Sequence, residues 1–409
     1  FLLATGTMLA RMALNTMAVM SCLSLTSAFA PSSTPMLRIG RPVSAVNSQS
    51  TPSGISLKMG LFDGITKAFE TPGAPGGASL DQYQGWIERD GMRVFSFDGI
   101  QPTALPSVGQ FSLAGRNAGA APPPQQQNSG GLFGFLSPSQ PVNSPPPKEN
   151  QDGVLMVPTL YDDIGMYCVF DGHGEYGGQI TQWCIQNLPA YMQPALAEGR
   201  PGQLLNRITD AYRAADAALV DGVGYQTAED SGSTLATALL KGDLLLVAGL
   251  GDSRVVLGVN NGDGTLGAQP VTLDQSPVVA TEKARIEAAG GEVRSEGPGG
   301  RVYARGEEYP GLAVSRAFGD ADAKQYGVTS DPQFIGWKIR PGQDFALILA
   351  SDGVWNALSN EIVVEIAAKF VANRDANGAA KEIVAASRQV WESIAKGRID
   401  DISAVVVYL

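Results

Sequence analysis

The stretch CVFDGHGEYGG (residues 168–178) contains the only histidine of this 409-residue chain. It overlaps an apolar run, YCVF at 167–170, whose length and composition predict a buried β-strand. Asp171 and Gly172 follow this run directly. A strand that ends in Asp-Gly places a carboxylate at the rim of a sheet, and the glycine lets the backbone turn and brings a carbonyl close to whatever the carboxylate binds. The stretch therefore predicts that Asp171 lies at the rim of a sheet, with His173 close to it.

Similar apolar runs continue along the sequence in both directions. Further strands are predicted within 83–115 (MRVFSF and GQFSLAG) and at 233–240, 244–249, 254–259, 345–350 and 402–409. Helical periodicity predicts helices over 178–194, 201–221, 280–289, 360–373 and 378–396. The strands come in hairpin-like groups separated by pairs of helices. This order favours an α+β fold, with antiparallel sheets covered by helices, over a doubly wound parallel sheet.

Several aspartates occupy strand ends like that of Asp171. They are Asp152 in KENQDG, Asp352 in LASDGVW, and the pair Asp400 and Asp401 in RIDDISAVVV. One Asp-Gly pair alone indicates only a turn, so the argument depends on several of them in combination. Clusters of oxygen ligands suit hard cations such as Mg²⁺ or Mn²⁺ rather than zinc.

Composition excludes several other classes of function. The formal net charge of −11 repels phosphodiester backbones, so we expect no nucleic-acid partner. The three cysteines are too few and too badly spaced for a disulfide framework or a thiolate metal site.

The N-terminal part of the sequence has a different composition from the rest. No Asp or Glu occurs in residues 1–62, whereas arginine, serine, threonine and alanine are frequent, which is typical of an import sequence. The text LTSAFAPSS (25–33) resembles the bipartite plastid-targeting presequences of algae with complex plastids, with cleavage expected between Ala28 and Phe29. We therefore predict a presequence over 1–58, a plastid location, and no stable membrane insertion of the mature form. A plain secretory signal is the alternative.

The remaining sequence is interpreted as one domain with an insertion. Residues 59–82 are predicted to form a linker with a short amphipathic helix, and residues 83–409 a single domain. The segment 117–148 is rich in Pro, Gly, Ser and Gln, so it is predicted to be a flexible insertion within that domain.

Eight motifs, in a characteristic order, carry a resemblance to one family. They are KENQDG, CVFDGHGEYGG, EDSGSTLATALL, VAGLGDSRVVLG, RIEAAGGEV, RVYARGEEYPGLAVSRAFGD followed by KQYGVTSDPQ, ILASDGVWNALSNEI and DDISAVVV. Over roughly 110–409 the chain resembles the PPM, or PP2C-type, metal-dependent serine/threonine protein phosphatases. The resemblance implies an αββα sandwich of two antiparallel sheets flanked by helices. It also implies two Mg²⁺ or Mn²⁺ ions per subunit and phosphorylated proteins as substrates.

The resemblance also implies roles for individual residues. Asp171 matches a carboxylate that bridges two metal ions, and Gly172 matches a carbonyl ligand. Asp152, Asp352 and Asp400 match further carboxylates at or near the metals. His173 matches the residue that gives a proton to the leaving serine or threonine oxygen, for which an imidazole is suited near neutral pH. The turns GDSR (251–254) and SRAFGD (315–320) are interpreted as structural, with Arg254 pairing with a carboxylate.

Departures from the family pattern affect the same region. Gln151 replaces an acidic residue and Pro147 replaces a phosphate-binding arginine, so Lys148 or Arg116 is the candidate for contacting phosphate. Asn356 replaces an aspartate of a third metal site, for which the possible remaining ligands are Glu229 and Asp230.

These departures leave two classes of function open. One is an active phosphatase that uses a metal-activated water, and the other is a catalytically impaired relative that serves as a binding scaffold. The presence of Asp171, His173 and Asp352 favours the enzyme.

Overall fold

The computed structural model describes a subset of the chain. The described residues are 86–89, 92–95, 105–116, 148–197, 203–297, 299–394 and 398–409. The predicted presequence, the 59–82 segment and residues 117–147 of the predicted insertion lie outside them. None of the helices in the described ranges has an apolar stretch long enough to cross a bilayer.

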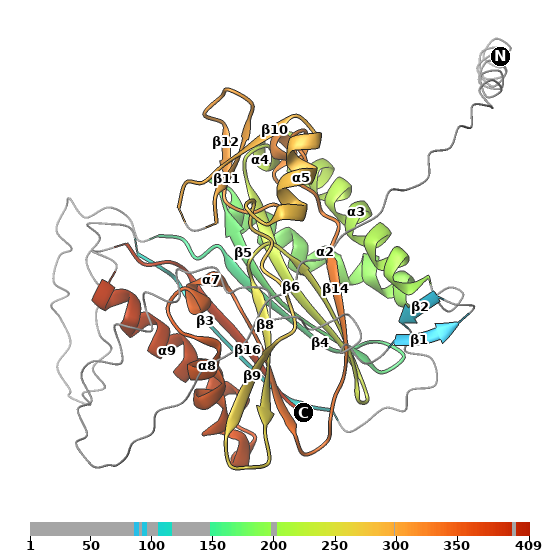
Figure 1. Cartoon of the computed structure of the whole chain (residues 1–409), viewed down its shortest axis with the longest axis vertical. Helices are drawn as coiled ribbons and strands as arrows, with labels where there is room; N and C mark the ends of the chain where they lie inside the picture. The colour runs from blue at the N-terminus through green and yellow to red at the C-terminus, as the bar shows by residue number, and fades with distance from the viewer. Residues whose placement is uncertain are drawn as a thin grey trace, which may run out of the picture. The chain divides into compact units, whose positions relative to one another are not determined.

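Two antiparallel sheets form the centre of the fold (Figure 1). The first has the order β14 (Gln333–Lys338), β7 (Leu244–Leu250), β6 (Gly232–Lys241), β5 (Ile164–His173) and β4 (Asp152–Tyr161), with the short β13 (Phe318–Gly319) paired to β6. The second has the order β3 (Ser107–Leu113), β16 (Ile402–Tyr408), β15 (Asp344–Ala350), β8 (Arg254–Asn260) and β9 (Leu266–Pro270).

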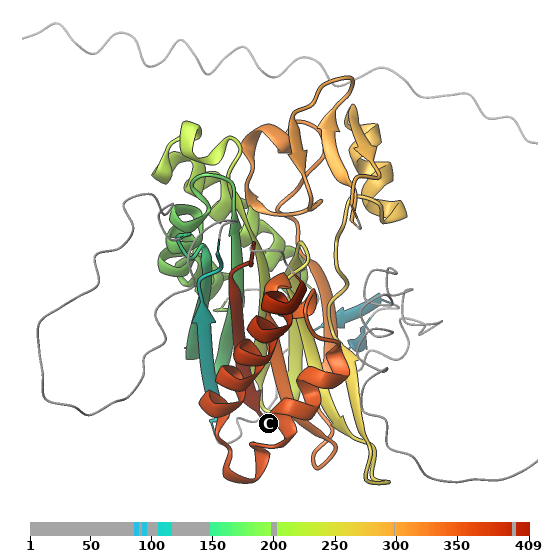
Figure 2. The same ribbon diagram turned by 90° about the vertical axis from the view of Figure 1, so that its left-hand side faces the viewer.

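The two sheets pack face to face, with helices on both outer faces. Residues of β5, β6, β7, β8, β15 and β16 form one buried apolar cluster between the sheets. Every residue of β6, β7 and β16 is buried, as expected for strands with one face on the other sheet and one face under helices. Helices α2 (Gly177–Ala197) and α3 (Leu204–Val223) cover the first sheet, and α8 (Asn360–Ala368) and α9 (Ala376–Ile394) cover the second (Figures 1 and 2).

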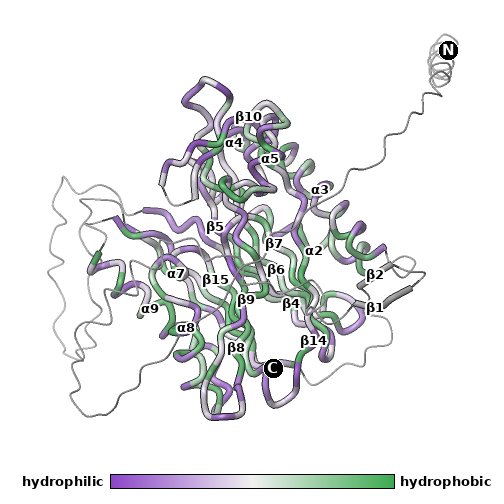
Figure 3. Tube along the Cα trace, in the orientation of Figure 1, coloured by the Kyte–Doolittle hydropathy of each residue, from purple (hydrophilic) through white to green (hydrophobic). Residues whose placement is uncertain are grey.

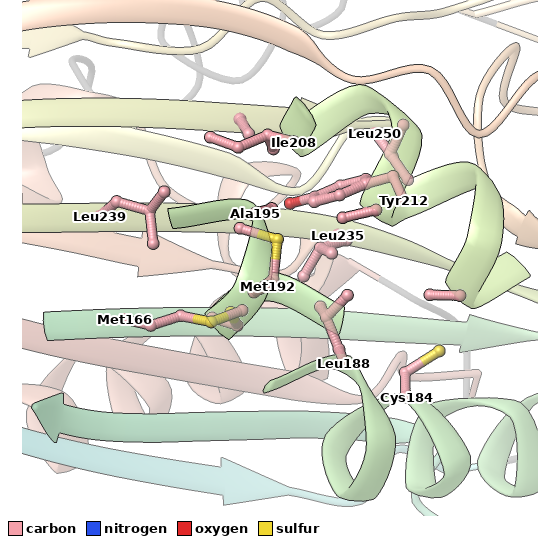
Figure 4. Close-up of a cluster of buried hydrophobic side chains, with 14 of the residues drawn as sticks. Met166, Cys184, Leu188, Met192, Ala195, Ile208, Tyr212, Leu235, Leu239 and Leu250 are labelled. Atoms are coloured by element: carbon pink, nitrogen blue, oxygen red, sulfur yellow. The ribbon is translucent and has the colours of Figure 1, made fainter. Parts of the chain in front are cut away.

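The helices follow the apolar periodicity of the sequence. In α3 the buried positions include Leu204, Ile208, Tyr212, Ala215 and Leu219, which lie three or four residues apart. Tyr212 belongs to one buried cluster with Leu235, Leu239 and Leu250 of the first sheet and Met192 of α2 (Figure 4). Along the chain trace, apolar residues concentrate in the strands and on the inner sides of these helices (Figure 3).

A smaller unit projects from one end of the sandwich (Figure 2). It contains α5 (Ala280–Ala288) and a three-stranded sheet of β10 (Gly291–Arg294), β11 (Arg301–Ala304) and β12 (Pro310–Leu312). Ile286, Val302, Ala323 and Val328 form its own small core. The remaining elements are β1 (Trp86–Arg89), β2 (Met92–Phe95), α4 (Tyr225–Ala228), α6 (Ala321–Lys324), α7 (Asp352–Trp355) and a 3₁₀ turn at Val371–Asn373.

The predicted fold class is confirmed. The structure is α+β, with two antiparallel sheets between two helical layers. The strands and helices predicted within the described residues are present, with ends shifted by a few residues, whereas the short helix predicted within 59–82 lies outside them. The helix predicted at 360–373 ends as α8 at Ala368 and is followed by a 3₁₀ turn. Strands β4, β9 and β14 and the three strands of the small unit were not predicted.

Candidate active site

The predicted aspartates gather at one end of the sandwich because their strands begin or end there. Asp152 opens β4 and lies directly opposite Asp171 near the end of β5. Asp352 follows β15 at the start of α7, and Asp400 precedes β16, which is paired to β15. Asp252 follows β7 at the same end, since Leu250 pairs with Leu235 of β6. These five residues, Asp152, Asp171, Asp252, Asp352 and Asp400, are called the carboxylate cluster below.

Burial and mutual repulsion raise the pKa values within the carboxylate cluster. The pKa of Asp171 is well above its ordinary value, first because of burial and then because of the charges of the other four members. Burial and the same kind of repulsion raise the pKa of Asp352 well above its ordinary value. The pKa of Asp152 rises to about 7 and that of Asp252 to about 6, with burial again the largest cause. Like charges held together in this way are stabilised by a cation.

The donor atoms of the cluster suit a hard cation. Asp152 Oδ2 accepts a hydrogen bond of 2.7 Å from Ser351 Oγ, but its buried Oδ1 has no partner among the described residues. A buried acceptor without a partner is costly, and a metal ion or its water would satisfy it. Among the described residues, no group of three or more His, Cys, Asp or Glu side chains is placed to hold a metal ion. Mg²⁺ is usually held by one or two carboxylates and keeps several waters, so the cluster fits an ion of that kind.

His173 is held by an aspartate from a distant part of the sequence. Its Nε2 atom lies 2.8 Å from Oδ2 of Asp320, which is only 2% exposed. Burial alone would lower the pKa of His173, but the charge of Asp320 and its hydrogen bond outweigh burial and raise it. The pair therefore favours the protonated imidazolium near neutral pH.

Asp320 is in turn positioned by the turn that carries it. Its backbone is left-handed, with φ of 48°, and its N–H donates to the carbonyl of Ser231. The preceding Gly319 N–H donates to Asp216 Oδ1 at 2.9 Å, and Lys324 Nζ donates to the same carboxylate. A Cβ atom on Gly232 would overlap Asp320 Oδ2, so this strand position needs glycine. The first sheet and α3 together therefore fix the carboxylate that faces His173.

The two adjacent late aspartates have different roles. Asp401 is 3% exposed and accepts hydrogen bonds from the N–H groups of Gly115 at 2.6 Å and Gln151 at 3.0 Å. It joins the ends of β3 and β4 to the start of β16. Asp400 has a side chain that is 43% exposed, and its charge acts on Asp171 and Asp352. Of the two, Asp400 is thus the more accessible to a ligand.

Lys148 and the two replaced positions within the described residues, Gln151 and Asn356, each make a specific contact. Lys148 Nζ lies 2.9 Å from Asp400 Oδ1 and 3.0 Å from Asp401 Oδ2. Gln151 Nε2 donates to the carbonyl of Gly174 at 2.9 Å, directly after His173. Asn356 Nδ2 donates to Asp352 Oδ2 at 3.0 Å.

The other candidate residues lie near the site. Arg116 pairs with Ile399 through two backbone hydrogen bonds, one residue before Asp400, and its buried Nε has no partner among the described residues. Asp230 Oδ1 accepts a hydrogen bond from Ser231 Oγ, near the residues that follow His173. Asp252, which was not a predicted ligand, is one of the aspartates whose charge raises the pKa of both Asp171 and Asp352.

Sequence reasoning missed two site residues, Asp252 and Asp320. Asp252 comes directly after the apolar strand LLLVAG and its glycine turn, which is the same strand-end signal that identified Asp171. For Asp320 no local signal existed, because its partner His173 is 147 residues away. The predicted pairing of Arg254 with a carboxylate is confirmed, since its guanidinium binds both oxygens of Asp274 at 3.0 and 2.6 Å.

Comparisons with known proteins identify the family of the chain and agree with its fold. The family model described as protein phosphatase 2C matches residues 148–399, which is more than half of the chain. The chain therefore belongs to the protein phosphatase 2C family, the PPM-type serine/threonine phosphatases.

Individual relatives support this assignment, and a solved structure has a similar fold. "Probable protein phosphatase 2C 64" of Oryza sativa subsp. japonica is 35% identical over 64% of this chain, and the match spans 62% of the rice protein's length. "Probable protein phosphatase 2C 72" of Arabidopsis thaliana is 33% identical over 60% of this chain and 77% of its own. The crystal structure of serine-threonine phosphatase 2C from Toxoplasma gondii has the same fold, with a TM-score of 0.57 and 24% identity over 76% of this chain and 97% of that chain.

Proposed function

We propose that this protein hydrolyses phosphoserine and phosphothreonine in proteins with two Mg²⁺ or Mn²⁺ ions per subunit. The observation that carries the proposal is the half-buried carboxylate cluster, in which a buried oxygen of Asp152 has no partner among the described residues. Asp152, Asp171, Asp352, Asp400 and the Gly172 carbonyl would hold the ions. When bound, a pair of such ions would lower the pKa of a water that attacks phosphorus and would neutralise phosphoryl oxygens.

His173 would supply the proton for the leaving serine or threonine oxygen. Its Nε2 faces the Asp320 carboxylate, which accepts a hydrogen bond, so Nδ1 is the nitrogen left to face the substrate. Asp320 favours the imidazolium and fixes the ring, as a second carboxylate does for many functional histidines. The pair thus keeps a proton donor next to the carboxylate cluster.

The test is hydrolysis of a phosphothreonine peptide by the whole chain with Mn²⁺, with Mg²⁺ and with chelator. We expect metal-dependent turnover that falls by about 10²-fold or more in His173→Ala and in Asp171→Asn. Asp210→Asn is a matched control, because that side chain is 74% exposed on α3. Folded protein that binds Mn²⁺ without turnover would refute the proposed enzyme activity and favour a binding scaffold. The observation that favours the scaffold is the neutral amide of Gln151, which donates to the carbonyl of Gly174 next to His173.

We also propose import into a plastid through residues 1–58. The support is the absence of acidic residues up to Leu61 and Phe62 together with the text LTSAFAPSS. A fluorescent protein fused behind residues 1–58 should accumulate in the plastid of an alga with complex plastids. Secretion of that fusion would favour the plain secretory signal.

A further inference from the structure

We propose that Lys148 is a built-in counter-ion of Asp400 that competes with the divalent cation and weakens its binding. The inference rests on the proposed metal-dependent function and concerns the regulation of the same site. It assigns a role to the first residue of the motif KENQDG, in which Gln151 departs from the family pattern, as does Pro147 directly before the motif.

The contact geometry places the ammonium group between two carboxylates. Lys148 Nζ lies 2.9 Å from Asp400 Oδ1 and 3.0 Å from Asp401 Oδ2, and the lysine side chain is only 23% exposed. Asp401 is buried and fixed by two backbone N–H donors, so it holds the ammonium group in place. Asp400 is the more exposed of the two partners. It is also a member of the carboxylate cluster, and its charge acts on Asp171.

The charges indicate competition rather than cooperation. A cation on Asp400 must share that carboxylate with an ammonium group held about 3 Å away from it. Even with the screening of bulk water, a monocation and a dication about 6 Å apart repel by roughly the equivalent of a tenfold change in affinity. Removal of the Lys148 charge should therefore tighten metal binding.

The surrounding structure tolerates the loss of the ammonium group. Asp401 keeps its hydrogen bonds from Gly115 and Gln151 without Lys148, so the junction of β3, β4 and β16 stays paired. Lys148 lies four residues before the first residue of β4 that is paired to β5, Asp152, and is not itself part of a strand. A variant at this position is thus expected to fold.

The experiment is a calorimetric titration of Mn²⁺ into the whole chain in the absence of substrate. Lys148→Met should bind Mn²⁺ about tenfold more tightly than the wild type. Lys148→Arg, which keeps the charge, should stay close to the wild type. Lys338→Met is the matched control, because it makes the same change in net charge on a lysine that is 56% exposed at the far end of β14.

The possible outcomes distinguish a counter-ion role of Lys148 from a phosphate contact and from failure of the proposed metal-dependent function. Equal dissociation constants for wild type and Lys148→Met would overturn the inference, and so would an equal gain in Lys338→Met. An unchanged Mn²⁺ affinity combined with weaker inhibition by inorganic phosphate would instead make Lys148 a phosphate contact. If none of the variants bound Mn²⁺, the proposed metal-dependent function itself would fall.

Discussion

Glu282 of α5 allows a stability prediction with a magnitude. Its side chain is 4% exposed and accepts hydrogen bonds from Arg316 Nη2 at 2.6 Å, Arg285 Nη1 at 2.7 Å and Ser315 Oγ at 2.7 Å. Burial would raise the pKa of Glu282, but the hydrogen bonds from Arg316 and Ser315 and the charge of Arg316 outweigh burial and lower it to about 2. The network joins the small unit to the segment that leads to β13 and Asp320.

The lowered pKa sets the size and the pH dependence of this contribution. A carboxyl whose pKa falls from 4.5 to about 2 on folding contributes about 3 kcal/mol to the free energy of unfolding at neutral pH. Because the folded-state pKa is the lower one, this contribution is complete above pH 4.5 and is lost as the pH falls toward 2. Glu282→Gln should therefore destabilise the protein by about 3 kcal/mol at pH 7, partly by leaving Arg316 without its buried partner.

The assay is urea denaturation of wild type and variant at several pH values between 7 and 3, with unfolding measured by circular dichroism. Glu287→Gln on the same helix is the control; that side chain is 48% exposed and its oxygen lies 3.7 Å from Lys283 Nζ, so it should cost less than about 0.5 kcal/mol. The difference between wild type and Glu282→Gln should shrink below pH 4.5. Equal effects of the two substitutions at pH 7, or a difference that does not depend on pH, would refute the reasoning.

Two further predictions concern the support of His173. Asp320→Asn should lower kcat for a phosphothreonine peptide by about 10²-fold, because a neutral amide no longer stabilises the imidazolium, while the dissociation constant for Mn²⁺ stays the same; an unchanged kcat would remove Asp320 from the mechanism. Gly232→Ala should lower the free energy of unfolding by about 1–3 kcal/mol and reduce activity, since the new Cβ overlaps Asp320 Oδ2 and the carbonyl of Phe318; a stable, fully active variant in the same denaturation and turnover assays would show that the turn can shift without cost.

The contacts of the Lys148 side chain could not be predicted from its neighbours in the sequence. From its position next to the replaced arginine, it was a candidate for contacting phosphate. In the structure its ammonium group lies on Asp400 and Asp401, which are 252 and 253 residues further along the chain. A long flexible side chain has no preferred partner in a local pattern, so only the approach of β16 to the start of β4 decides what it contacts.

The sequence by itself determined the elements and the residue types of the site. Continuous apolar runs predicted β5, β6, β7, β8, β15 and β16, because strands buried on both faces need apolar residues at nearly every position. A period of about 3.6 residues predicted the main helices, because each buries one face. Asp171 and Asp352 were singled out as candidate site residues because each begins an Asp-Gly pair after an apolar run. Strand β4 was missed because its residues are only partly buried at the sheet edge, so its pattern is weak.

Only the tertiary structure decided which of these residues meet. The order of strands in each sheet placed Asp252 beside Asp352 and Asp171, and the turn after β13 placed Asp320 on His173. The structure also separates the roles of the two adjacent aspartates. Asp401 joins three strand ends, whereas Asp400 belongs to the carboxylate cluster. The physical reason is that periodicity reports burial along one element, whereas contacts between residues 100 or more positions apart depend on how separate elements pack.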